Sequence, residues 1–213
     1  MRETFHQELR DLRGDTLRMG EYVIEAVRRA TTALAEGDTE LAHAVIAGDE
    51  AIDALYLDIE ARGYALLAQQ QPVAKDLRLI LAIVRIIQDL ERSGDLAKNI
   101  GEIVRSDIQI VKLKPVAETI GQLGLMARDL MATSMRAFTS KDLALAQTLD
   151  AKDNQIDELY KRLIKELFKL EKESSLELAV NMVLTGRYFE RIADHAVNIA
   201  IWVTYLITGN RPG

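Results

Sequence analysis

One stretch organises the sequence, Arg187-Tyr-Phe-Glu-Arg-Ile-Ala-Asp-His-Ala-Val-Asn-Ile-Ala200. Its acidic residues Glu190 and Asp194 lie four positions apart, so on an α-helix they share one face. Helical steps in either direction along that face reach apolar residues, among them Val183 and Val197. Two carboxylates therefore interrupt an apolar stripe at positions where a purely structural helix would carry leucine or valine.

A closely similar string occurs in the first half of the chain, Leu90-Glu-Arg-Ser-Gly-Asp-Leu-Ala-Lys-Asn-Ile100, at a shift of 99 residues. A second pair of strings repeats at a shift of 104 residues, and its members are Gly48-Asp-Glu-Ala-Ile-Asp-Ala-Leu-Tyr56 and Lys152-Asp-Asn-Gln-Ile-Asp-Glu-Leu-Tyr160. This period is far too long for a solenoid. The sequence therefore contains two copies of one helical unit, and each copy carries two acidic pairs.

Apolar residues at three- and four-residue spacing predict six long helices and no strands. Stop and cap signals place the first three helices at 3–36, from Thr39 to about Gln70, and from the Gln69-Gln-Gln-Pro72 turn to near Ile110. The fourth helix runs from Pro115 to about Phe138, and the fifth begins after the cap Ser140-Lys-Asp142. The sixth runs from the capping box of Ser174 and Glu177 to just before Gly209. Gly37-Asp38 reads as a helix stop followed by a cap.

Lys112-Leu-Lys-Pro115 is the best boundary between the halves. The predicted fold is all-α, with residues 1–111 and 112–213 each forming a bundle of three antiparallel helices. The two bundles are joined end to end or side by side.

Composition narrows the class of protein. With 48% hydrophobic and 28% charged residues, the chain is typical of a soluble globular protein, and its lack of cysteine excludes disulfides and thiolate metal sites. The formal charge of −6 argues against nucleic acid and against electrostatic binding to anionic lipid. Since no apolar signal segment and no bilayer-length apolar run is present, we expect a cytoplasmic protein that meets a membrane only through partners.

Four acidic pairs occupy equivalent places in the repeat, on two neighbouring helices of each half. They are Asp49 and Asp53, Glu91 and Asp95, Asp153 and Asp157, and Glu190 and Asp194. Burying carboxylates one turn apart is costly, because like charges disfavour joint ionisation and desolvation adds to that cost. Each set of four therefore needs a positive partner.

Two kinds of partner fit these spacings about equally well. One is arginine, because Arg92 and Arg191 adjoin the glutamates and Arg187 lies one turn before Arg191, which would make an ion-pair network that orients the helices. The other is a metal ion. Oxygen ligands alone predict Mg²⁺, Mn²⁺, Ca²⁺ or iron rather than zinc.

The sequence gives less support for a catalytic site than for an ion-pair network or a metal site. Glu40-x-x-His43 has the spacing of a di-iron bundle motif, but such a site needs two of these pairs and two further glutamates. His195 follows Asp194 and points away from the acidic line, as a surface or packed histidine would. The sequence has no nucleophile–base set and no phosphate loop. We therefore expect a protein without enzymatic activity, with a metal-dependent hydrolase, a di-metal oxidase and a purely structural scaffold as the alternatives.

The chain resembles the PhoU family of bacterial phosphate-uptake regulators along essentially its whole length. The motifs that carry the resemblance are Asp49-x-x-x-Asp53, Pro72-Val-Ala-x-Asp-Leu-Arg78, Glu91-Arg-x-Gly-Asp95, Asp153-x-x-x-Asp157 and Arg187-Tyr-x-Glu-Arg-x-Ala-Asp-His-Ala196. Each motif is short, but their order and spacing together are specific.

The resemblance implies two three-helix bundles related by pseudo-twofold symmetry. It implies one metal site formed by Asp49, Asp53, Glu91 and Asp95, and another formed by Asp153, Asp157, Glu190 and Asp194. It further implies a cytoplasmic homodimer that acts with the ATPase of the phosphate ABC transporter and with a phosphate-sensing histidine kinase. Such proteins keep the phosphate-starvation response off when phosphate is plentiful.

Overall fold

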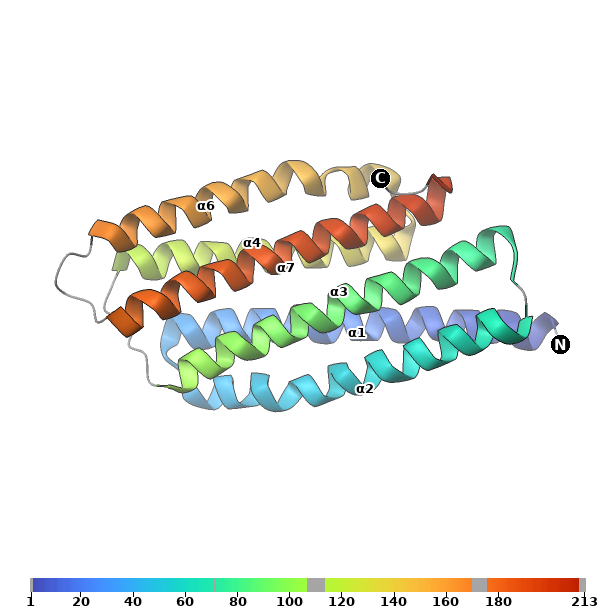
Figure 1. Cartoon of the computed structure of the whole chain (residues 1–213), viewed down its shortest axis with the longest axis horizontal. Helices are drawn as coiled ribbons and strands as arrows, with labels where there is room; N and C mark the ends of the chain where they lie inside the picture. Colours follow the sequence, from blue (N-terminus) through green and yellow to red (C-terminus); the bar gives the residue numbers. More distant parts are fainter. Residues whose placement is uncertain (1, 71, 107–113, 170–175, 211–213) are drawn as a thin grey trace.

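The computed structural model describes residues 2–70, 72–106, 114–169 and 176–210, and they form long helices that lie side by side (Figure 1). The helices are α1 (Arg2–Glu36), α2 (Thr39–Gln70), α3 (Ala74–Arg105), α4 (Lys114–Ser140), α5 (Leu143–Gln147), α6 (Leu149–Lys169) and α7 (Leu176–Thr208). No strand occurs within these described ranges.

The two predicted bundles are confirmed. Helices α1, α2 and α3 pack against one another in the first half, and α4, α6 and α7 do so in the second. The halves lie side by side, because α3 packs against α7 and α1 packs against α4 (Figure 1). One continuous apolar core runs through both halves, and its largest fully buried side chains include Leu12, Met19, Phe138 and Phe189.

Most of the predicted helix ends are present. Gly37 has a φ of 68°, and the Asp38 carboxylate accepts a hydrogen bond of 2.9 Å from the Leu41 backbone N–H. Asp142 caps α5 in the same way, through a bond of 2.9 Å from the Leu145 N–H. At the end of α7, Gly209 has a φ of 78° and its N–H donates to the Tyr205 carbonyl.

Two predicted helices differ from the structure. The fifth is interrupted at Thr148, whose backbone N–H donates to the Leu145 carbonyl three residues back at 3.1 Å, in a turn tighter than that of an α-helix. The third ends at Arg105 rather than near Ile110, because Ser106 closes the last turn through its N–H and its hydroxyl. The predicted cap Ser174 lies outside the described residues.

No helix in the described part of the chain combines the length and the apolar character that crossing a membrane requires. Helices α3 and α7 each carry many buried positions and contact each other across the boundary between the halves. Each of them also carries one of the repeated acidic strings, so the strings sit beside the middle of the molecule.

Candidate functional site

The structure brings each predicted set of four carboxylates together. In the first half, Asp49 and Asp53 on α2 interact electrostatically with the acids Glu91 and Asp95 of α3. In the second half, α6 and α7 meet in the same way, and we call the two sets the first and second acidic clusters. The first consists of Asp49, Asp53, Glu91 and Asp95, and the second of Asp153, Asp157, Glu190 and Asp194.

Asp49 is the most buried member of the first cluster, with 3% of its surface exposed. Its Oδ2 accepts a hydrogen bond of 2.7 Å from Nζ of Lys98, which reaches across from α3. Its Oδ1 is buried and has no hydrogen-bond partner among the described residues. A Cβ at Gly94 would lie 3.4 Å from that Oδ1 and 3.1 Å from Ile52, so the missing side chain is what lets α2 and α3 approach here.

The other acids of the first cluster repel one another electrostatically. Burial raises the pKa of Asp53, and the charges of Asp49 and Asp95 raise it further. The pKa of Glu91 is likewise raised by burial first and then by Asp95 and Asp53. Asp95 itself is exposed to solvent. The cluster therefore holds more negative charge than its surroundings neutralise.

In the second cluster the most buried acid is Glu190, which is 8% exposed and pairs with Arg187 three residues before it on α7. Asp153 on α6 has a buried Oδ1 without a hydrogen-bond partner in the described structure. Burial raises the pKa of Asp153 to about 6, and the charges of Asp194 and Asp157 add to the effect. Burial also raises the pKa of Asp194, against the charge of Arg187.

The positive partners differ from those predicted. Arg187 forms the expected ion pair, but neither Arg92 nor Arg191 pairs with a carboxylate among the described residues. The sequence interpretation missed Lys98 altogether. Lys98 could have been found from its position three residues after Asp95, because that spacing puts the two residues on one face of α3.

The ligand atoms of the two clusters are of the kind that binds a hard cation, but their positions in the structure do not form a complete site. Carboxylate oxygens are what Mg²⁺, Mn²⁺, Ca²⁺ and iron prefer, and the partnerless Oδ1 atoms of Asp49 and Asp153 are candidate ligands. In the described parts of the chain, however, no three acidic, histidine or cysteine side chains are arranged to share one ion. Metal binding would therefore need rotation of the more exposed side chains, such as Asp95.

A buried polar contact joins the halves beside the clusters. Nδ1 of His195 on α7 lies 3.0 Å from Oγ of Ser93 on α3, so this histidine is packed between helices and not a surface residue. Burial lowers the pKa of His195 to about 4, and the charges of Arg191 and Arg92 lower it further. The side chain of Asn198 on α7 interacts with Asp89 of α3 across the same boundary.

Burial raises the pKa of that Asp89 to about 6, while Arg92, the Asn198 hydrogen bond and Arg85 act in the opposite direction. Because Asp89 is also buried, the contact between α3 and α7 holds two ionisable groups that are both shifted toward their neutral forms. These residues belong to the packing between the halves, and they contribute no atom to either acidic cluster.

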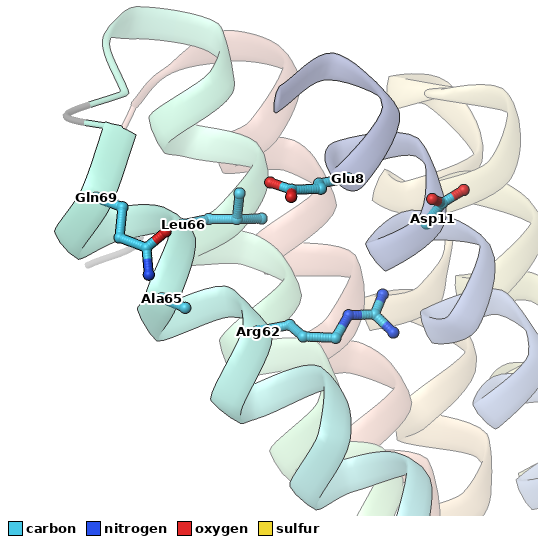
Figure 2. A pocket seen from close by; sticks show the side chains of 6 residues that line it. All are labelled: Glu8, Asp11, Arg62, Ala65, Leu66 and Gln69. Carbon is cyan, nitrogen blue, oxygen red and sulfur yellow. The ribbon is translucent and has the colours of Figure 1, made fainter. Parts of the chain in front are cut away.

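A hollow of about 270 Å³ lies between α1 and α2, away from both clusters (Figure 2). Glu8 and Asp11 border it from α1, and Arg62 extends toward them from α2. The guanidinium of Arg62 is held by Asp15 at 2.7 Å and Asp58 at 2.6 Å. The hollow contains none of the eight cluster acids, and its arginine is already paired.

Comparison with known proteins identifies the repeat. The family described as "PhoU domain" matches the chain twice, over residues 16–104 and 120–203. The chain is 36% identical over 211 residues to the phosphate-specific transport system accessory protein PhoU homolog of Synechocystis sp., covering 99% of this chain and 94% of that protein. It is 38% identical over 205 residues to the homolog of the same name from Aquifex aeolicus, covering 95% of this chain and 92% of that protein.

Solved structures agree with these relatives. The crystal structure of the phosphate transport system regulatory protein PhoU from Streptococcus pneumoniae superposes with a TM-score of 0.88 at 32% identity, and covers 98% of this chain and 99% of that one. The crystal structure of PhoU from Pseudomonas aeruginosa gives a TM-score of 0.88 at 31% identity, over 97% of this chain and 100% of that one. The likeness extends over both halves.

Proposed function

This chain belongs to the PhoU family, and on that premise we propose that it is a regulator of phosphate uptake that acts without enzymatic turnover. The observation that carries the proposal is the extent of the similarity. Relatives named as accessory proteins of phosphate-specific transport match this chain from end to end, and this chain covers almost all of each of them. A protein of that class serves a transporter without being part of its membrane-spanning channel.

The finer role is that of an adaptor. The chain would contact the ATPase of the phosphate ABC transporter at the cytoplasmic face of the membrane, and would also contact a sensor histidine kinase, so that the phosphate-starvation response stays off when phosphate is plentiful. Family membership supports this assignment. We also infer that the working form is a homodimer, which would present each contact surface twice.

The two acidic clusters would hold the cations of this adaptor. Asp49, Asp53, Glu91 and Asp95 would bind at the first cluster, and Asp153, Asp157, Glu190 and Asp194 at the second. A bound cation would supply the positive charge that these groups lack, as their raised pKa values indicate. With that charge in place, the carboxylates would remain ionised and hold α2 to α3 and α6 to α7.

The regulatory proposal is tested by deleting the gene in its own organism and measuring phosphate uptake and an alkaline phosphatase reporter. In phosphate-rich medium we expect the reporter to be expressed constitutively in the deletion strain and to be repressed again when the intact chain is restored. Unchanged phosphate control after deletion would rule the proposal out.

Two measurements on purified protein separate the adaptor from the alternatives. A binding assay with the purified transporter ATPase, or with the cytoplasmic part of the kinase, should show saturable binding. Turnover assays with a phosphoester and with peroxide, after loading with Mg²⁺, Mn²⁺ or iron, should show no activity. Catalytic turnover in either assay would favour a metal-dependent hydrolase or oxidase instead.

A further inference from the structure

A groove lies between α6 and α7 in the second half, and a related groove lies between α2 and α3 in the first half, where α7 also lines it. The groove of the second half is lined by Ile164, Leu167, Phe168, Ala179, Val180, Val183 and Leu184, and has a volume of about 400 Å³. Shifts of 104 residues along α2 and α6 and 99 along α3 and α7 place Tyr64, Leu81, Val84 and Arg85 at matching positions. These four line a groove of about 680 Å³ in the first half.

We call the latter the arginine groove, which is lined by Tyr64, Leu81, Val84, Arg85, Gln88, Trp202, Tyr205 and Gly209. Its difference from its counterpart is chemical. Arg85 stands where the second half has Leu184, and Tyr64 stands where it has Phe168. Since leucine serves at the equivalent position, packing of the helices does not require an arginine there.

Arg85 is exposed, and its guanidinium lies 5.6 Å from the centre of the Trp202 ring. Trp202 in turn meets Tyr205 edge to face, with ring centres 5.6 Å apart. Within the described residues Arg85 has no ion-pair partner, and the nearby Asp89 is buried and bonded to Asn198. The aromatic residues therefore hold the guanidinium in place while its donors stay available.

A second guanidinium continues the positive charge toward the start of α3. Arg78 lies seven residues before Arg85, about 10 Å along the helix and on the same face. Its Nε is buried and has no hydrogen-bond partner in the described structure. It contacts Gly209 at the groove's edge, where a Cβ would come within 3.0 Å of its Nη1. Glu60, one turn before Tyr64 on α2, already accepts hydrogen bonds from Tyr56 and Tyr64.

We propose that the arginine groove binds an acidic segment of a partner protein, with carboxylates on Arg85 and Arg78 and an apolar side chain against Tyr64 and Leu81. Trp, Tyr and Arg are the residues that contribute most to protein interfaces, and guanidinium pairs well with carboxylate. The charge selects the partner, because two guanidinium groups that form no ion pair among the described residues attract acids locally, even on a chain of net charge −6. The inference rests on the proposed function only in that an adaptor needs a protein partner.

The test uses the full chain and short end-blocked peptides in which aspartate and glutamate flank one phenylalanine, compared with the same peptides carrying lysine in place of the acids. Trp202 is the only tryptophan, so its indole N–H gives a single NMR signal that reports on the groove. We expect the acidic peptides to shift this signal saturably at millimolar concentration, and the lysine peptides to leave it unchanged.

Charge reversal by Arg85→Glu should weaken binding of the acidic peptide about tenfold or more. The matched control Lys165→Glu makes the same change of charge on exposed α6 of the other half, and should bind as the wild type does. A circular dichroism melt confirms that each variant is folded. Peptide binding that Arg85→Glu leaves unaltered, absence of binding, or an equal signal shift by the lysine peptides would overturn the proposal. None of these results depends on whether gene deletion derepresses the phosphatase reporter.

Discussion

The two acidic clusters occupy the same place in the two halves, yet a different cation faces each. In the first, Lys98 crosses from α3 to Asp49 on α2 and so ties two helices together. In the second, Arg187 pairs with Glu190 within α7 and ties none. The residue that matches Lys98 is Val197, and the one that matches Arg187 is Gln88. The two halves share their four pairs of acidic residues, but the basic residue that pairs with each cluster differs.

This difference bears on why the acids are there. A network whose purpose was ion pairing would keep both members of each pair, since a buried carboxylate without its partner is destabilising. Here Arg92 and Arg191 match, but the basic residues that form the ion pairs, Lys98 and Arg187, have no basic counterpart, while all four acidic pairs remain. The comparison therefore favours a role for the carboxylates themselves, with Lys98 and Arg187 acting as local and partial charge compensation.

The largest expected effect is loss of bound metal. Replacing Asp153, Asp157, Glu190 and Asp194 by their amides should remove the metal of the second cluster, because amide oxygens are neutral and bind cations more weakly. Elemental analysis of the purified protein should show that metal lost and the metal of the first cluster retained. The converse set of four substitutions should give the converse result.

The matched control removes two carboxylates of the same spacing from a solvated face of α1, by Glu21→Gln and Glu25→Gln. Glu21 is exposed, and Glu25 is paired with Arg28 and Arg29 rather than with other acids. This variant should keep the full metal content. Native protein that contains no metal would contradict the metal-binding proposal and leave the acids to an electrostatic role.

The next effect concerns a position where the halves differ in polarity. His195 matches Leu96 in the first half, and both are buried. The pKa of His195 is lowered to about 4, from an ordinary value near 6.5, so the folded state favours neutral histidine. Stability from this group is complete above about pH 6.5, and is lost as the pH falls toward 4. Relative to His195→Leu, the wild type should lose up to about 3 kcal/mol over this range.

Urea unfolding of both proteins between pH 7.5 and 4.5 measures this difference, and the facing groups Arg92, Arg191, Asp89 and Asp194 are common to both. The hydroxyl of Ser93 keeps its bond to the Asp89 carbonyl in the variant. A constant difference in unfolding free energy across the range would show that folding does not change the pKa of His195, and would contradict the burial of a neutral histidine.

The sequence predicted what depends on neighbouring residues in the chain. Gly37-Asp38 and Gly209 mark helix ends because their backbone and capping preferences act within one turn. Apolar periodicity showed which helix faces are buried, but it did not show which other helix each face packs against. The sequence therefore could not distinguish the side-by-side packing of α3 on α7 from an end-to-end arrangement of the two bundles. The break at Thr148 is a tight backbone turn onto Leu145, which apolar periodicity does not reveal.

The clusters show the same limit. Repetition of the acidic strings placed all eight acids on the right helices, since helical spacing is a local property. The partner of Asp49 was missed because it depends on the relative register of α2 and α3, and lysine is normally a solvated residue. Arg92 and Arg191 stand next to the glutamates in sequence, and for that reason point away from them on the helix.

A smaller effect distinguishes the two clusters, because one substitution in each should change the free energy of unfolding in opposite directions. In metal-free protein, Asp49→Asn should destabilise by about 1 to 2 kcal/mol, because it breaks a short charged hydrogen bond between helices at a buried site. The control Asp58→Asn removes an exposed bond of similar length to Arg62 and should cost less than about 1 kcal/mol. Chemical denaturation measures both, and equal losses would contradict the structural role of Lys98.

The smallest effect has the opposite sign. Asp153→Asn should stabilise the metal-free protein by about 1 kcal/mol at pH 7, because Asp153 has no cation partner in the described structure and its pKa is raised from 3.8 to about 6. A raised carboxyl pKa means that ionisation opposes folding above that pKa and that protonation relieves the cost. The advantage of Asp153→Asn should therefore shrink as the pH falls from 7 toward 4, and saturating divalent metal should reverse it by stabilising only the wild type. The control Glu21→Gln, on the solvated face of α1, should not give this gain. If Asp153→Asn destabilises the metal-free protein as Asp49→Asn does, the two clusters are equivalent after all, and the contrast between Lys98 and Arg187 has no energetic meaning.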